Sequence, residues 1–160
     1  MVERMENLVK RDGRWFKKFT EIPFTGQIIE HHDNGQLKEK GNYRNGEKEG
    51  AWSFHHDNGQ LKEKGNYRNG EKEGAWSFHH DNGQLREKGN YRNSELEGEW
   101  ITYYYNGQLR KKGKWKTRKE EGKWVGFNED GTVNESMTGT FIYGKNISNF
   151  WNHFKGNFLK

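Results

Sequence analysis

The chain contains no cysteine and few aliphatic residues. Without cysteine, this protein of 160 residues forms no disulfide bond, and it offers neither thiol chemistry nor thiolate ligands for a metal. Hydrophobic residues make up only 29% of the sequence, which is too few for one large compact core. A fraction this low is also typical of disorder, but aromatic residues reach 15% and recur at fixed spacing. We therefore expect a thin ordered fold whose core consists of Trp, Tyr and Phe.

The sequence also lacks a long hydrophobic run. No segment approaches the roughly 20 apolar residues that a membrane-spanning helix needs. Residues 1–13, MVERMENLVKRDG, contain no apolar stretch of the kind found in secretory signals. We expect a cytoplasmic protein, and the alternative is a secreted or periplasmic one from which a signal has been removed.

A tandem repeat of 24 residues dominates the chain. Residues 31–54 and 55–78 are identical, and each reads HHDNGQLKEKGNYRNGEKEGAWSF. Residues 79–102 keep 18 of the 24 positions, whereas residues 103–126 keep mainly the NGQL segment, the glycines and the tryptophan. A period of this length predicts stacked units that bury their apolar faces only against neighbours. The degenerate units at 11–30 and 127–146 are expected to cap an array that spans residues 1–146.

Each unit carries the pattern of an antiparallel hairpin. The dipeptide Asn58-Gly59 predicts a type I′ turn, because both residues tolerate the positive φ that its central positions need. Strands are therefore expected at residues 51–56 and 61–68. The polar segment 68–74 is predicted to be a longer connection to the next hairpin.

Alternation along these strands predicts an aromatic inner face and a charged outer face. Trp52 and Phe54 share the inner face with Tyr67, since successive side chains of a strand point to opposite sides. We predict that Gly65 lets the indole of a neighbouring Trp lie against the backbone. The expected fold is all-β: a single elongated, twisted antiparallel sheet of tandem hairpins, followed by a short C-terminal capping helix.

Three sequence segments recur together along the array: G-x-Y, with Trp115 in place of Tyr in the fourth unit, then E-G-x-W, then NGQL followed by a glycine. In combination they resemble the MORN repeat, in the bacterial variant whose members are often described as YwqK-type antitoxins. The resemblance covers about residues 11–145. It implies an elongated antiparallel sheet without catalytic residues, and a role in docking to proteins or anionic lipids or in neutralising a toxin. The aromatic position after W-x-x is occupied by Tyr103 and Phe127, but by His55 and His79 in the middle copies.

The repeat argues against catalysis. A catalytic constellation is a unique arrangement of nucleophile, base and oxyanion or metal partner, whereas the His and Glu residues here recur as columns. Adjacent histidines such as His55 and His56 point to opposite faces of a strand, and their equivalents lie roughly 9.6 Å away in the next copy. A shared metal site needs much closer ligands. We expect no enzyme, no cofactor and no bound metal, and we do not expect a small-molecule substrate.

Basic residues on the outer face form the first candidate binding surface. The segment 110–119, RKKGKWKTRK, alone holds seven basic residues and no acidic one. Such a surface can bind the phosphates of nucleic acid or of an anionic bilayer. The alternative is that these residues only solvate the outer face of a single-layer sheet. The candidate residues are Lys62, Lys64, Arg68, Arg86, Lys88, Arg92, Arg110, Lys112, Lys114, Trp115, Lys116 and Arg118.

The C-terminal segment 147–160 departs from the repeat. Aromatic residues recur there at i, i+4 and i+8, and Ser148 precedes them as a potential N-cap, which predicts a short amphipathic helix. This helix either covers the edge of the last hairpin or acts as a hook for a partner or a membrane surface. The residues of the candidate hook are Phe150, Trp151, Phe154 and Phe158.

The leading hypothesis for function is a non-enzymatic repeat scaffold that binds another protein, such as the partner in an immunity or antitoxin pair. The alternative is an anionic-lipid or nucleic-acid binder that uses the basic outer face. We expect a monomer, or weak self-association through the edges of the sheet. Because two identical copies cannot hold a unique site, specific recognition is expected in the fourth unit, the fifth unit and the aromatic tail.

Overall fold

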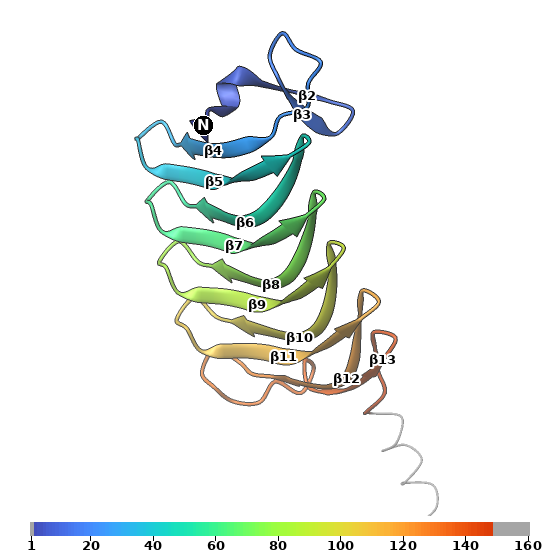
Figure 1. The fold of residues 1–160 in the computed structure, drawn as a ribbon. Helices are drawn as coiled ribbons and strands as arrows, with labels where there is room; N and C mark the ends of the chain where they lie inside the picture. The colour runs from blue at the N-terminus through green and yellow to red at the C-terminus, as the bar shows by residue number, and fades with distance from the viewer. Residues whose placement is uncertain (1, 149–160) are drawn as a thin grey trace, which may run out of the picture.

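A computed structural model describes residues 2–148, and most of them belong to one long sheet of twelve strands (Figure 1). The all-β repeat fold is therefore confirmed. Of the predicted helix in residues 147–160, all but residues 147 and 148 lie outside the described range, including Phe150, Trp151, Phe154 and Phe158.

Consecutive strands of the sheet are neighbours, so the chain forms a stack of hairpins (Figure 1). All neighbouring strands are antiparallel except β1, which pairs parallel to β4, so the sheet is mixed rather than wholly antiparallel. The strands of the sheet are β1 (Val2–Glu3), β4 (Gly26–His31), β5 (Leu37–Arg44), β6 (Glu47–His55), β7 (Leu61–Arg68), β8 (Glu71–His79), β9 (Leu85–Arg92), β10 (Glu95–Tyr103), β11 (Leu109–Lys116), β12 (Lys119–Gly126), β13 (Gly139–Ile142) and β14 (Lys145–Asn146).

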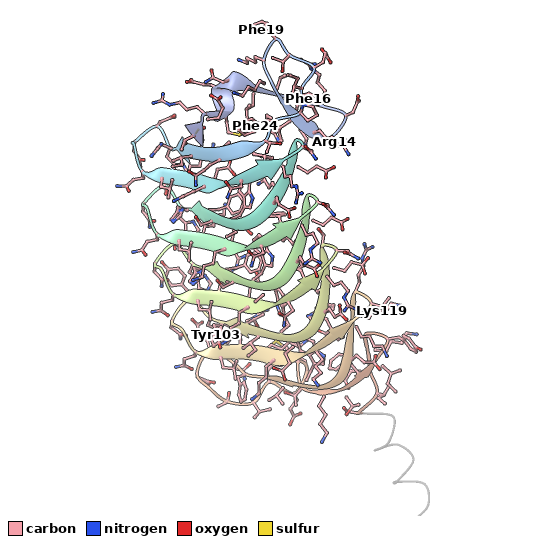
Figure 2. The ribbon with its side chains drawn as sticks, viewed as in Figure 1. Arg14, Phe16, Phe19, Phe24, Tyr103 and Lys119 are labelled. Carbon is pink, nitrogen blue, oxygen red and sulfur yellow. The ribbon has the colours of Figure 1, made fainter. Side chains whose placement is uncertain are left out.

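The N-terminal residues form a separate small unit at one end of the sheet. A 3₁₀ turn, η1 (Met5–Asn7), precedes β2 (Leu8–Arg11) and β3 (Arg14–Lys17), which pair only with each other. Trp15 and Phe24 pack against Tyr43 at ring-centroid distances of 6.3 and 6.0 Å. Phe19, which holds the repeat register in the sequence, instead projects from a loop and is 99% exposed (Figure 2).

The two turns of each hairpin unit are the reverse of the prediction. At Asn58-Gly59 only the glycine has a positive φ, at 83°, so a type I′ turn there is wrong. The Gly59 amide donates a hydrogen bond to the carbonyl of His56 at 3.0 Å, which closes a wider turn. At Asn69-Gly70 both residues have positive φ, at 50° and 79°, as a type I′ turn requires.

The tight turn at Asn69-Gly70 also moves the start of the next strand. Arg68 pairs directly with Glu71, so segment 68–74 is a hairpin turn followed by a strand, and not a long connection. The same holds one copy earlier, where β6 begins at Glu47 instead of residue 51.

A bulge in each hairpin makes room for a tryptophan. Between β7 and β8, Lys64 pairs with Ser77 and Asn66 with Glu73, so the three residues 74–76 oppose the single residue Gly65. The Trp76 indole lies on Gly65 so closely that a Cβ there would overlap the ring. The predicted approach of indole to glycine is confirmed, and it recurs for the other three repeat tryptophans.

The core is a row of aromatic rings on this inner face of the sheet. Tyr67 meets Trp76 edge to face at 5.1 Å, and Tyr91 meets Trp100 in the same way at 5.5 Å. The four repeat tryptophans are only 2–5% exposed. Edge-to-face pairs are a favoured aromatic arrangement, so the row joins each hairpin to the next in the absence of a second layer.

Candidate functional site

The outer face of the sheet, opposite the aromatic rings, carries a column of lysines. On β7 every second residue is exposed, including Lys64, and these residues alternate with the half-buried inner ones. The equivalent positions on the neighbouring odd-numbered strands are also lysines. One strand lies between each pair of them, so their Cα atoms are about 10 Å apart. We call this set the lysine column: Lys40, Lys64, Lys88 and Lys112.

An open hollow of about 880 Å³ follows the lysine column along the outer face. Small residues of β6 and β8 form its floor and leave the backbone uncovered: the serines pair with lysines of the column, and the alanines pair with the neighbouring asparagines. A second hollow of about 620 Å³ continues from Glu99 and Ile101 toward β12. We call the two together the outer groove. Its floor in the identical copies is Ala51, Ser53, Ala75 and Ser77, and it is flanked there by Lys40, Asn42, Lys64, Asn66, Lys88 and Asn90.

The positive charge of the lysine column is not compensated by ion pairs. None of the salt bridges within residues 2–148 involves a member of the column. Two acidic residues line the outer groove: Glu99, and Glu121, which accepts a hydrogen bond from the amide of Tyr143 at 3.1 Å. The groove is therefore mainly positive, and most of all between β5 and β9.

The structure divides the predicted basic residues into those inside and those outside the outer groove. Lys64, Lys88, Lys112 and Lys114 line it. Arg118 lies in a turn and forms an ion pair with Glu95 at 2.7 Å. The remaining predicted residues are exposed on the same strands but do not line the groove: Lys62, Arg68, Arg86, Arg92, Arg110 and Lys116.

Trp115 is not part of the outer surface, contrary to the prediction. It follows Lys114 on β11, so alternation turns it to the inner face, where it meets Trp124 edge to face at 5.8 Å. Its indole Nε1 is buried and has no hydrogen-bond partner. Lys111 points inward too and pairs with Glu120, so the basic run 110–119 is split between the two faces.

The inner face holds a second set of lysines, each paired with a glutamate. Lys72 lies 2.8 Å from Glu63, and its Nζ sits 4.0 Å from the ring centroid of Trp76. Burial lowers the pKa of the equivalent Lys48, because it disfavours the charged ammonium. In the fourth unit the pair is reversed, with Lys111 in the glutamate position and Glu120 in the lysine position. These ammonium groups are already bound and are not available to a ligand.

The histidines act as structural links between copies. The ring Nε2 atoms of His32 and His56 lie 3.1 Å from the backbone carbonyls of His55 and His79, one repeat further on. The hydroxyl of Tyr104 makes the same link to Phe127 at 2.8 Å. Within residues 2–148, no group of three or more His, Asp or Glu residues is placed to hold a metal. The described part of the chain also contains no helix that is long and apolar enough to cross a membrane.

Sequence reasoning missed two parts of the outer groove. Lys40 belongs to the lysine column, and its place follows from Lys64 by the period of 24 residues. The floor of small residues was also overlooked, although Ala51 and Ala75 stand where the other copies have the larger polar residues Gln27, Glu99 and Lys123. Both signals were present in the repeat register.

A single sheet of stacked 24-residue hairpins, with aromatic rings on one face and a polar groove on the other, defines a β-hairpin repeat protein. The chain belongs to the MORN repeat variant family. The family pattern matches four tandem segments that together make up more than half of the chain, namely residues 24–45, 48–69, 72–93 and 96–117.

Among solved structures, the protein is similar to one chain of the GtfA/B complex bound to UDP and GlcNAc, with 16% identity. The aligned region covers 88% of this protein and 28% of that chain. It is also similar to accessory secretory protein 1,2 and 3 in Streptococcus pneumoniae, with 16% identity and coverage of 83% and 24%. The chain thus spans about a quarter of their length, and TM-scores of 0.28 support no argument. No curated protein matches it.

Proposed function

We propose that the protein is a non-enzymatic scaffold that binds a segment of another protein in the outer groove. The observation that carries this proposal is the groove itself, which is open to solvent and crosses several consecutive hairpins. Sites for small molecules are usually enclosed and bury most of the ligand, whereas a long open surface of repeats suits a protein segment. The resemblance of the repeat to bacterial antitoxins suggests an immunity or antitoxin pair as one form of this function.

A variant with a filled groove tests the proposal. Ala51 and Ala75 lie on the groove floor, and Phe at both positions would occupy the space without adding charge. A display library of protein fragments of mixed charge would be selected against the wild-type protein. Selected fragments should bind the Ala51→Phe/Ala75→Phe variant about tenfold more weakly or worse, since the anchoring pocket is blocked.

Phe19→Ala provides the matched control, because Phe19 is exposed on a loop and does not line the groove. Circular dichroism would establish that both variants fold. Selection of no fragment, or of fragments that bind the wild-type protein and the filled variant equally, contradicts the proposal.

The lysine column supports a second candidate function, the binding of anionic lipid or nucleic acid. Four ammonium groups that form no ion pair with the described part of the chain would attract phosphates along one face, and such binding weakens steeply as salt rises. Titration with phosphatidylserine vesicles and with single-stranded DNA at low ionic strength tests this candidate. If the protein binds neither the vesicles nor the DNA at low salt, this second candidate function is rejected.

A further inference from the structure

The lysine column has a spacing that matches an extended peptide. Successive members are separated by two strand spacings, about 10 Å. A peptide in the polyproline II conformation advances about 3.1 Å per residue and has three residues per turn, so every third side chain lies on the same side at intervals of about 9.3 Å. A segment that crosses the strands along the groove would therefore present one side chain to each lysine.

The groove also offers partners for a peptide backbone. Asn42, Asn66 and Asn90 flank the floor at the same interval as the lysines. Each asparagine amide both donates and accepts hydrogen bonds, as the free N–H and C=O groups of an extended segment require. The alanine and serine floor leaves room for that backbone to approach the sheet.

The lining of the groove favours a peptide over a nucleic acid. Single-stranded nucleic acid is held by aromatic rings on which its bases stack. The tryptophans next to the floor, Trp52 and Trp76, turn their rings to the inner face and are 2% exposed. Ala51 and Ser53 offer nothing on which a base can stack. A carboxylate of a peptide needs only the ammonium group, which the column supplies.

We propose that the outer groove binds an extended acidic peptide segment that carries a carboxylate at every third residue. This inference rests on the proposed function and specifies the chemistry of its partner. The glutamates of the segment pair with Lys40, Lys64, Lys88 and Lys112, and its backbone lies over the small residues between them.

The test uses two synthetic peptides of equal composition. The first consists of four Glu-Pro-Pro triplets, so that its glutamates follow the spacing of the lysine column. The second has the four glutamates in one block, followed by the prolines. Binding to the full chain would be measured by fluorescence anisotropy at several salt concentrations. The spaced peptide should bind about tenfold more tightly than the block peptide or better, and its affinity should fall as salt rises.

The chain supplies its own variant for this test. Glu99 occupies in the third copy the position that Ala51 and Ala75 occupy in the identical copies, so a glutamate there is compatible with the fold. Ala51→Glu/Ala75→Glu places two carboxylates beside the lysine column and should weaken the spaced peptide about tenfold or more. The matched control is Phe19→Glu/Ile22→Glu, which adds the same charge at side chains that are 99% and 74% exposed and should leave the affinity unchanged.

Four outcomes would overturn the inference. One is equal binding of the spaced and block peptides, and another is an equal loss of affinity in the groove variant and the control. The third is that single-stranded DNA of the same charge displaces the spaced peptide at equal or lower concentration, which would make the groove a general polyanion site. The fourth is that neither peptide binds while neutral fragments from the display selection still bind the groove. That last result rejects the acidic segment and leaves the proposed scaffold function intact.

Discussion

Position 65 requires a glycine because the indole of Trp76 occupies the place where a Cβ would lie. The same arrangement joins Gly41 to Trp52, Gly89 to Trp100 and Gly113 to Trp124. Each tryptophan also covers a bulge at which three residues oppose one. The glycine, the bulge and the indole therefore form one structural arrangement that recurs in each of these hairpins.

We predict that Gly65→Ala lowers the free energy of unfolding by about 1–3 kcal/mol or more, because the added Cβ pushes the Trp76 ring off the strand. Asn66→Ala is the control, since this neighbour points to the exposed outer face and should change stability by less than about 0.5 kcal/mol. Urea unfolding followed by tryptophan fluorescence measures both. Similar stabilities of the two variants would contradict the packing seen here.

Two half-buried histidines should make the protein sensitive to acid. Burial lowers the pKa of His55 and of His79 from the ordinary value of 6.5, so the unfolded chain binds these protons more readily than the folded one. Stability is therefore present above about pH 6.5 and is lost as the pH falls below it. Tyr103 and Phe127 occupy the same repeat position without an ionisable imidazole.

The variant His55→Tyr/His79→Phe should lose less stability than the wild-type protein between about pH 7.5 and about pH 5.5. Urea midpoints at both pH values measure the difference. The control for the substitution itself is His31→Tyr, at the equivalent but exposed position of the first copy. An unaltered slope in the double variant would show that these imidazoles do not set the acid sensitivity.

For single residues, the sequence predicted correctly which side chains face inward wherever the alternation along a strand decides it. The inner place of Trp52 and the role of Gly65 followed from a period of two and from the absence of a side chain. Trp115 was assigned wrongly because the basic composition of its segment was given more weight than its place on the strand. A run of like charges crosses both faces of a sheet, and only every second residue shares a surface.

Among the structural elements, the turns were the least predictable. The Asn-Gly dipeptide occurs in both turns of a unit, so the dipeptide alone cannot tell a two-residue turn from a wider one. In the wider turn the Asn58 side chain accepts a hydrogen bond from the Gln60 amide at 2.9 Å. That local bond stabilises a non-positive φ at the asparagine and leaves only Gly59 in the left-handed region.

The tight turn between β11 and β12 is strained by its sequence. Thr117 and Arg118 have φ values of 48° and 61°, where the first two regular copies place Asn and Gly. Left-handed backbone costs an ordinary residue about 1–2 kcal/mol, and a β-branched residue is least suited to it. The exposed ion pair of Arg118 with Glu95 offsets little of this cost.

Thr117→Asn/Arg118→Gly should therefore raise the free energy of unfolding by about 1–2 kcal/mol. The reverse exchange in an earlier copy, Asn69→Thr/Gly70→Arg, should lower it by a similar amount. Thermal and urea unfolding of the two variants would be compared with the wild-type protein. The two variants must change the free energy of unfolding in opposite directions. A loss of stability in both would disprove the proposed strain.

The inner ion pairs are expected to tolerate reversal but not the replacement of the lysine by a second carboxylate. Lys72→Glu sets a second carboxylate beside Glu63 in a half-buried site and should cost about 2–3 kcal/mol. The double variant Glu63→Lys/Lys72→Glu reproduces the arrangement of Lys111 and Glu120 and should return to within about 1 kcal/mol of the wild-type protein.

A double-mutant cycle by urea unfolding measures the coupling between these two residues. The matched control is Lys72→Leu, because Leu96 stands at this position in the third copy and shows that an apolar side chain fits there. Costs that simply add up in the double variant would mean that the two side chains act independently.

For the whole molecule, each copy contacts mainly its neighbours, because the order of strands in the sheet follows the chain. Such arrays gain and lose whole units without losing their fold. Deletion of residues 55–78, one complete copy, should give a folded protein that unfolds at a lower urea concentration and with a smaller m-value.

Deletion of residues 55–66, half a copy, is the control. It removes most of one strand, so the following strand would have to run parallel to its new neighbour, which a short connection does not permit. Circular dichroism should report a folded sheet for the first deletion and not for the second. If both unfold, the copies do not behave as independent stacked units.

The overall architecture was predictable because the period and the alternation act on every copy alike. The parallel pairing of β1 with β4 was not, since it involves only Val2 and Glu3 and depends on where the following turn and hairpin place them. The outer groove was also beyond prediction as a shape, although each residue that lines it was visible in the repeat.

The covered edge of β4 limits how copies of this chain can associate. Val2 and Glu3 pair with Gln27 and Ile28, and the Met5 amide donates to the Glu30 carboxylate at 3.1 Å. A fibre of sheets joined end to end needs a free edge at both ends of every molecule. Because the short strand β1 occupies part of this edge, a second molecule cannot pair along the whole length of β4, and this end of the sheet is a poor template for open-ended growth.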